Sequence, residues 1–148
     1  MTELSGRIEQ GTHRFPVRVY HEDTDIGGIV YYANYLKFAE RARTELLRLA
    51  GINQTEMASR YGMSFAVRDC AIDFRRPARF DDLLEVRSRL VGLAGATVSA
   101  VQAIWHGTEE LARLDIRVAC LNRDGRPARI PAPLRRALEP YIQPVEQS

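Results

Sequence analysis

The sequence has little cysteine, histidine and tryptophan, and almost no surplus of charge. Its 148 residues include two cysteines, three histidines and one tryptophan, and the formal net charge is +2. Cys70 and Cys120 lack the spacing of a metal site and lie in apolar, strand-like runs. We therefore expect two reduced core thiols, no metal or other cofactor, and a cytoplasmic protein. The arginines are scattered among acidic residues, which disfavours binding to nucleic acid.

Long apolar segments are also missing. The first ten residues are polar and lack the apolar centre of a signal peptide. No apolar run approaches the roughly 20 residues that span a bilayer, so we expect no transmembrane segment. A chain of 148 residues fits one domain, which we place at 1–148 with a flexible stretch at 1–12.

The spacing of apolar residues predicts one long helix from about residue 32 to residue 50. Its expected apolar stripe comprises Tyr35, Phe38, Ala39, Ala42, Leu46 and Leu49. On the other faces, Arg41 with Glu45 and Glu40 with Arg43 have the spacing of intrahelical ion pairs. Gly51 suits the left-handed residue that ends a helix.

The remaining elements are strands and two short helices. Alternating patterns predict strands at 13–20, 63–75, 83–91, 97–105 and 111–121. Shorter helices are predicted at 55–61 and 133–142. Because helices and strands do not alternate, we expect an α+β fold in which an antiparallel sheet curls around the long helix. The other face and the edges of such a sheet favour an oligomer.

The segment before the long helix carries the residues best suited to chemistry. Asp23-Thr24-Asp25 precedes Gly27-Gly28, and glycines let a ligand approach the main chain closely. The first turn of a helix presents unpaired N–H groups that stabilise an oxyanion. A carboxylate at Asp25 with such donors is sufficient for thioester hydrolysis, as a nucleophile or as a general base.

A purely structural interpretation fits the same residues. An Asp-Thr-Asp-x-Gly-Gly segment before a helix is also typical of a loop with an Asx-turn and an N-cap. From these residues alone we favour the structural interpretation, because short motifs give many false matches.

A resemblance to a known family reverses that order. The segment 20–43 resembles the signature of the 4-hydroxybenzoyl-CoA thioesterase family, most closely its YbgC-type branch, which is encoded beside the Tol-Pal genes. The matching pattern is Tyr20-x-x-Asp23-Thr24-Asp25-x-x-Gly28-Ile29-Val30-Tyr31-Tyr32-x-Asn34-Tyr35-x-x-Phe38-x-Glu40-x-Ala42-Arg43. The resemblance covers nearly the whole chain. It implies the hotdog fold, a long helix wrapped by an antiparallel sheet, in homodimers or homotetramers with active sites between subunits.

The resemblance also implies roles for single residues. It makes Asp25 the catalytic carboxylate and the backbone N–H of Tyr32 the group that polarises the thioester carbonyl. His21 is a further catalytic candidate beside the alternative of a half-exposed histidine at a strand end; many members of the branch carry tyrosine there and histidine at the position of Tyr32. The implied substrate is an acyl-CoA. Expected substrate-binding residues are Gly28, Val30, Tyr31 and, for the CoA phosphates, Arg75 and Arg76.

Two other possibilities stay open. Glu40 matches an acidic residue of the family's helix, for which we favour a structural ion pair over a catalytic role. The chain could instead be an adaptor for acyl carrier protein or for phospholipid-synthesis enzymes at the inner membrane. Arginines at 75, 76, 79, 126 and 129 would then form a patch that meets an acidic partner.

Overall fold

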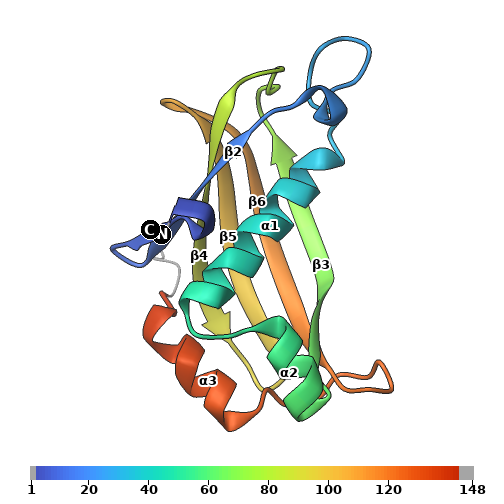
Figure 1. Cartoon of the computed structure of the whole chain (residues 1–148), viewed down its shortest axis with the longest axis vertical. Coiled ribbons are helices and arrows are strands. Elements are labelled where there is room, and N and C mark those ends of the chain that lie inside the picture. Colours follow the sequence, from blue (N-terminus) through green and yellow to red (C-terminus); the bar gives the residue numbers. More distant parts are fainter. Residues whose placement is uncertain (1–2, 144–148) are drawn as a thin grey trace.

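The computed structural model describes residues 3–143, which form one antiparallel sheet and three α-helices (Figure 1). The strand order is β1-β2-β4-β5-β6-β3. The strands are β1 (Arg7–Glu9), β2 (Thr12–Arg18), β3 (Ser64–Phe74), β4 (Leu83–Leu93), β5 (Thr97–His106) and β6 (Glu109–Leu121). The helices are α1 (Asn34–Leu49), α2 (Gln54–Tyr61) and α3 (Ala132–Leu138), and short 3-10 turns lie at Glu3–Ser5, His21–Asp23 and Glu139–Tyr141.

Helix α1 lies along the inner face of the curled sheet (Figure 1). Its apolar stripe is buried at Tyr35, Phe38, Ala39, Ala42 and Leu46, while Leu49 is half-buried. The stripe residues up to Ala42 pack in one core with inward-facing residues of the central strands, whereas Leu46 belongs to a second core cluster. The predicted α+β class and the hotdog arrangement, a long helix wrapped by an antiparallel sheet, are confirmed.

Helix α1 begins two residues later than predicted. The backbone N–H of Asn34 donates to the carbonyl of Tyr31 at 2.8 Å, so residues 31–34 form a turn that leads into the helix, with Tyr32 and Ala33 at its centre. Ala33 is the N-cap and supplies no side-chain hydrogen bond. At the other end, Gly51 has a φ of +93°, and the predicted left-handed termination is confirmed.

The two ion pairs predicted within α1 are wrong. Among residues 3–143, neither pair lies within 4.0 Å. Glu45 instead accepts a hydrogen bond from Ser5 Oγ at 2.7 Å and pairs with Arg48 at 3.2 Å. Arg43 turns toward the sheet and donates to Gln102 Oε1 at 2.9 Å. The contacts of Glu45 with Ser5 and of Arg43 with Gln102 thus replace the predicted ion pairs, which are weak interactions on a helix surface.

The short helices cover one end of the sheet (Figure 1). Asn53 caps α2, because its side chain accepts hydrogen bonds from the N–H groups of Thr55 and Glu56 at 2.9 and 3.1 Å. Met57 of α2 and Leu138 of α3 are buried in a second core cluster beside Leu90 of β4. The last predicted helix is shorter than expected, because a 3-10 turn replaces it from residue 139.

The strands agree with the predicted ranges to within about two residues, with one addition. β1 pairs with β2 in antiparallel register, Ile8 opposite His13. The sequence analysis did not predict this strand, because three residues are too few to show an alternating pattern.

Strand β3 is an edge strand that α1 leaves largely uncovered. Within residues 3–143 it pairs only with β6, and nine of its eleven residues are exposed. Val67 and Phe74 are 49% and 47% exposed. The prediction that both cysteines are core thiols is therefore half wrong, because Cys70 on β3 is exposed whereas Cys120 on β6 is buried.

One buried histidine makes stability depend on pH. His13 is fully buried on β2, and its Nε2 lies 2.7 Å from the carbonyl oxygen of Ser5. Burial lowers the pKa of His13, although the Ser5 carbonyl and the charge of Glu45 oppose the shift. As pH falls below about 6.5, the unfolded chain therefore binds this proton before the folded protein does, and stability decreases.

We predict that the free energy of unfolding falls more steeply between pH 7.5 and pH 5 in the wild type than in His13→Gln. Denaturant unfolding at a series of pH values measures both slopes. Parallel curves over this interval would contradict the prediction, and above pH 7.5 the two slopes should agree.

Candidate active site

Asp23 holds the loop between β2 and α1 in shape. Its side chain is buried, and Oδ2 accepts a hydrogen bond from the N–H of Tyr20 at 2.8 Å. Its carbonyl accepts from the N–H of Tyr31 at 3.1 Å and from the Asn34 side chain at 2.8 Å. These bonds fasten both ends of the loop to the start of α1.

Asp25 sits at the exposed turn of this loop. Its Oδ1 accepts a hydrogen bond from the N–H of Gly27 at 2.8 Å, which is an Asx-turn. The backbone closes the turn through Asp25 N–H to Ile29 O at 2.9 Å and Gly28 N–H to Asp25 O at 3.1 Å. The expected Asx-turn is therefore present, but Asp25 is not the N-cap of α1. Its Oδ2 has no hydrogen-bond partner within residues 3–143.

Gly27 and Gly28 are each favoured at their positions for a different structural reason. A side chain at position 27 would place its Cβ 3.2 Å from Asp25 Oδ1 and crowd the carboxylate. Gly28 has a φ of +78°, a conformation that other residues rarely adopt.

The loop rests on the segment that follows β3. Val30 is buried, and its N–H donates to the carbonyl of Ala78 at 2.8 Å. The N–H of Ala78 in turn donates to the hydroxyl of Tyr35 at 2.8 Å in a buried position. Burial raises the pKa of this tyrosine, which therefore stays protonated. The loop, the helix and the 75–80 segment are thus connected by these two hydrogen bonds and by antiparallel bridging of Ile29 with Arg79.

These three parts enclose an open cavity of about 550 Å³. It lies where the start of α1 meets the end of β3. Its lining comprises Asp25, Ile29, Val30, Tyr32, Tyr35, Phe74, Arg75, Arg76 and Pro77. A carboxylate, two basic side chains and an apolar floor therefore meet at one place.

The backbone at the entrance to α1 offers donors beside this cavity. In the described part of the chain, the N–H groups of Tyr32 and Ala33 have no hydrogen-bond acceptor. The first four N–H groups of an α-helix lack intrahelical partners and carry a partial positive charge. A site with a carboxylate on one side and such donors on the other suits acyl transfer.

Comparison with known proteins agrees with this geometry. The sequence model of the thioesterase-like superfamily matches residues 19–138, which is most of the chain. The chain belongs to the thioesterase-like superfamily.

Individual relatives within the superfamily are similar over most of their length. The chain is 44% identical over 108 residues to the acyl-CoA thioesterase YbgC of Haemophilus influenzae, covering 73% of this chain and 79% of that protein. It is 40% identical over 111 residues to the acyl-CoA thioester hydrolase YbgC of Escherichia coli, covering 74% and 81%. A crystal structure of a probable thioesterase from Bartonella henselae superposes with a TM-score of 0.77 at 42% identity, covering 81% and 99%. The resemblance inferred from residues 20–43 is confirmed.

Within this thioesterase-like fold, not every predicted site residue lines the cavity. Asp25, Tyr32, Val30, Arg75 and Arg76 do. Three others do not. Gly28 shapes the turn. The ring of Tyr31 is tilted against that of Tyr32, with the centroids 4.8 Å apart, and a hydrogen bond with the Tyr32 side chain raises the pKa of Tyr31. His21 is exposed and stacks on Phe80 at 3.8 Å.

Four lining residues were missed as site residues: Ile29, Tyr35, Phe74 and Pro77. Tyr35 was predicted only as part of the core stripe, while Phe74 and Pro77 lie at and beyond the end of β3. For Tyr35 a signal existed, because a buried tyrosine hydroxyl needs a hydrogen-bond partner. Phe74 and Pro77 carried no such signal.

The basic residues beside the cavity already have acidic neighbours. Arg75 pairs with Asp73 at 3.0 Å and with Glu110 at 3.3 Å, and both acids raise the pKa of Arg75. Arg76 lies 3.6 Å from Glu109. All the side chains in these ion pairs except that of Glu110 are well exposed. An anionic ligand can therefore replace the acidic partners of Arg75 and Arg76 at little cost in free energy.

The single arginine patch predicted for an acidic partner is wrong. The N–H of Arg75 donates to Leu111 O near the start of β6, whereas Arg126 accepts from Asn122 just beyond its end. The strand between them has 13 residues, about 44 Å at 3.4 Å per residue. The arginines at 75, 76 and 79 therefore lie far from those at 126 and 129.

Residues 3–143 contain no group of three or more histidine, cysteine, aspartate or glutamate side chains arranged to hold a metal ion. None of the helices in the same part of the chain has the length and apolarity needed to cross a membrane.

We predict that Tyr35→Phe lowers the free energy of unfolding by about 1–3 kcal/mol, because it leaves the buried N–H of Ala78 without an acceptor. Denaturant unfolding measures the change. The matched control is Tyr61→Phe, whose hydroxyl has no hydrogen-bond partner in the described residues. Equal losses in both variants would show that the hydroxyl of Tyr35 does not matter.

Proposed function

We propose that the protein hydrolyses acyl-CoA thioesters to a free carboxylic acid and CoA. One observation carries the proposal: the carboxylate of Asp25 and the residue with an unpaired helix-entrance N–H, Tyr32, line the same open cavity. The relatives named as acyl-CoA thioesterases support this substrate class.

The reaction centres on Asp25, whose exposed Oδ2 is free to react while Oδ1 is held by Gly27. As a general base, the carboxylate removes a proton from water, and the resulting hydroxide attacks the thioester carbonyl carbon. As a nucleophile, it attacks that carbon itself and forms a mixed anhydride that water then cleaves. In both routes the C–S bond breaks and the thiolate leaves. Because a thiolate is a good leaving group, no separate general acid is needed.

The backbone N–H of Tyr32 stabilises the negative charge that develops on the carbonyl oxygen. It stands at the entrance of α1, a helix of 16 residues with its positive dipole end toward this point. Loss of one such donor typically costs about 2.7–4 kcal/mol of transition-state stabilisation. The role belongs to the main chain, so it does not depend on the tyrosine ring.

The other predicted residues have supporting parts. Val30 forms part of the apolar floor, and Gly28 and Tyr31 set the course of the loop around it. Arg75 and Arg76 bind the phosphates of CoA by exchanging their acidic neighbours for phosphate oxygens. His21, stacked on Phe80 outside the cavity lining, acts at most by supporting the loop.

We predict that Asp25→Asn lowers kcat for acyl-CoA hydrolysis by about 10²–10⁴-fold, the usual contribution of a general base. Release of free thiol from a panel of acyl-CoA esters measures the rate. Glu22→Gln is the matched control, since Glu22 is an exposed acid of the same segment outside the cavity. The thermal unfolding midpoint should be the same in all three proteins.

Equal turnover by Asp25→Asn and the wild type would remove Asp25 from the reaction. Failure of the wild type to hydrolyse any ester would favour the second function, an adaptor for acyl carrier protein or phospholipid-synthesis enzymes at the cytoplasmic side of the inner membrane. The separation of the arginines at the two ends of β6 already weakens that second function.

We propose further that two copies of the chain pair through β3. An unpaired edge strand of 11 residues with exposed apolar side chains invites pairing with another strand. Antiparallel pairing of β3 with its copy about a two-fold axis would continue the sheet and cover Val67 and Phe74. A homotetramer would then require a second contact between such dimers.

We predict that Val67→Lys shifts the protein from dimer to monomer at micromolar concentration, because it places charge in the proposed contact. Size-exclusion chromatography with light scattering measures the mass. The control is Ala71→Lys, also exposed on β3 but aligned with Asp115 on the other face of the sheet. If Val67→Lys keeps the mass of the wild type, the β3 contact is not the dimer interface.

A further inference from the structure

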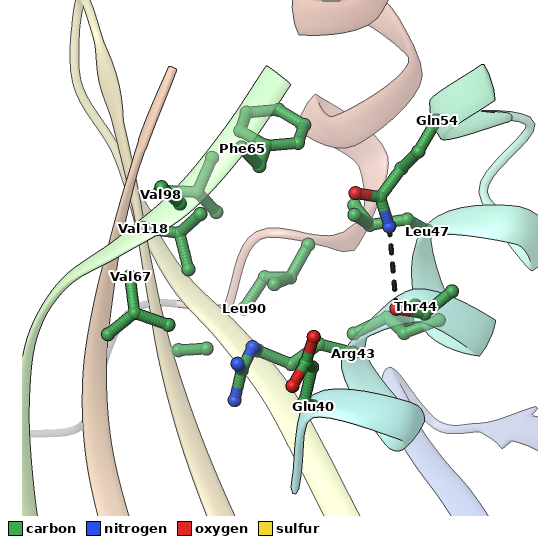
Figure 2. Close-up of a pocket in the computed structure, with 13 residues that line it drawn as sticks. Glu40, Arg43, Thr44, Leu47, Gln54, Phe65, Val67, Leu90, Val98 and Val118 are labelled. Atoms are coloured by element: carbon green, nitrogen blue, oxygen red, sulfur yellow. Dashed lines mark hydrogen bonds between the residues drawn. The ribbon is translucent and has the colours of Figure 1, made fainter. Parts of the chain in front are cut away.

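A second cavity lies farther along α1. It has a volume of about 240 Å³ and is bounded by α1, the start of α2 and the inner face of the sheet (Figure 2). Its apolar lining includes Leu47, Phe65, Val67, Leu90, Val98 and Val118. An engineered apolar cavity of about 150 Å³ holds benzene, so this one holds a group of about ten non-hydrogen atoms.

The two cavities share the same pair of elements. Tyr35 of α1 and Phe74 of β3 line the Asp25 cavity, and Arg43 of α1 and Val67 of β3 line the second one. The proposed position of the thioester carbonyl is at the N–H of Tyr32, and the Arg43 guanidinium is held near Ala39, because both bind the amide of Gln102. Ala39 follows Tyr32 by seven positions, which is about 11 Å along the helix. An extended chain advances about 1.2 Å per bond, so roughly ten bonds join the two places.

Arg43 is the positively charged residue of the second cavity, and the core fixes its position. Its Nη1 donates to Gln102 Oε1 at 2.9 Å. The Gln102 amide nitrogen donates to Ala39 O at 3.0 Å and to Ser88 Oγ at 2.9 Å. Both Gln102 and Ser88 are fully buried. Because both donors of the amide are used, its oxygen must face Arg43, and the guanidinium cannot move freely.

The rest of this guanidinium lacks partners. Within residues 3–143, Gln102 is its one hydrogen-bond acceptor, and no acidic group lies within 4.0 Å. Arginine is half-buried here, and burial lowers the pKa of Arg43. A ligand without an oxygen would leave these donors unsatisfied beside an apolar chain, which is costly.

Glu40 limits which acceptor can bind. It lines the same cavity from α1 (Figure 2). Its negative charge raises the pKa of Arg43 and so opposes the effect of burial on that pKa. A carboxylate ligand would be repelled by Glu40, whereas a hydroxyl or keto oxygen would not. Thr44 and Gln54, joined at 3.4 Å, add polar groups to the same rim (Figure 2).

We propose that the cavity between α1 and β3 receives the distal part of the acyl group, and that Arg43 selects acyl chains that carry a hydroxyl or keto oxygen about ten bonds from the thioester. This inference rests on the proposed hydrolysis of acyl-CoA at Asp25. It names a substrate class for that site, a medium-length chain oxygenated near its end.

The test compares decanoyl-CoA with 10-hydroxydecanoyl-CoA. The wild type should show a kcat/KM about ten- to a hundredfold higher for the hydroxylated ester, the range for a hydrogen bond to a charged group. Arg43→Met keeps the length of the side chain without its donors and should remove the preference. Arg41→Met is the control, because Arg41 lies on the same helix outside this cavity and should leave the preference unchanged.

A binding measurement separates failure of this inference from failure of the proposed function. Calorimetric titration of the Asp25→Asn protein with both esters gives the same preference as a ratio of Kd values without turnover. Equal Kd values and equal kcat/KM values would overturn the role of Arg43, as would a preference that survives in Arg43→Met. If the wild type hydrolyses neither ester while the Kd values still differ and Arg43→Met equalises them, the hydrolysis proposal fails and the cavity assignment stands.

Discussion

Burial of the apolar stripe of α1 against the sheet is the interaction on which the other features depend. Phe38, Ala39 and Ala42 are fully buried, and they pack with inward-facing residues of the central strands. Burial of a large apolar side chain such as that of Phe38 contributes about 1.5–3 kcal/mol to the free energy of unfolding. Because Ala39 and Ala42 place small side chains in the middle of the stripe, the helix can lie close to the strands, and its first turn lies at one end of the sheet.

The same interaction explains what is left uncovered. A single helix cannot cover six strands, so the inner side of β3 remains open along α1. Both cavities lie on that side, one at the start of the helix and one along its second half. The edge that exposes apolar side chains is thus also the edge along which substrate would lie, and a second copy pairing there would help to enclose it.

The loop before α1 is rigid for a separate reason, its own hydrogen bonds. Asp23 binds Tyr20 at one side and Tyr31 and Asn34 at the other, while Val30 is tied to Ala78. Asp25 is left at the exposed turn, with one oxygen fixed by Gly27. Asp23, two residues earlier, is buried and holds the loop in shape. The two aspartates therefore differ in environment and in role.

The sequence by itself determined the α+β class, the long helix with its stripe, the strands from β2 to β6 and the family, because these follow from local periodicity and from a long ordered motif. It also singled out Asp25, Tyr32, Arg75 and Arg76, which the fold brings to one cavity. Only the tertiary structure decided that Cys70 is exposed, that Arg43 binds Gln102 instead of Glu40, and that Tyr35 joins the site through Ala78. Each of these depends on which residue lies opposite across the sheet or the helix. Contacts between residues 40 or more positions apart cannot be predicted from the local pattern of apolar and polar residues.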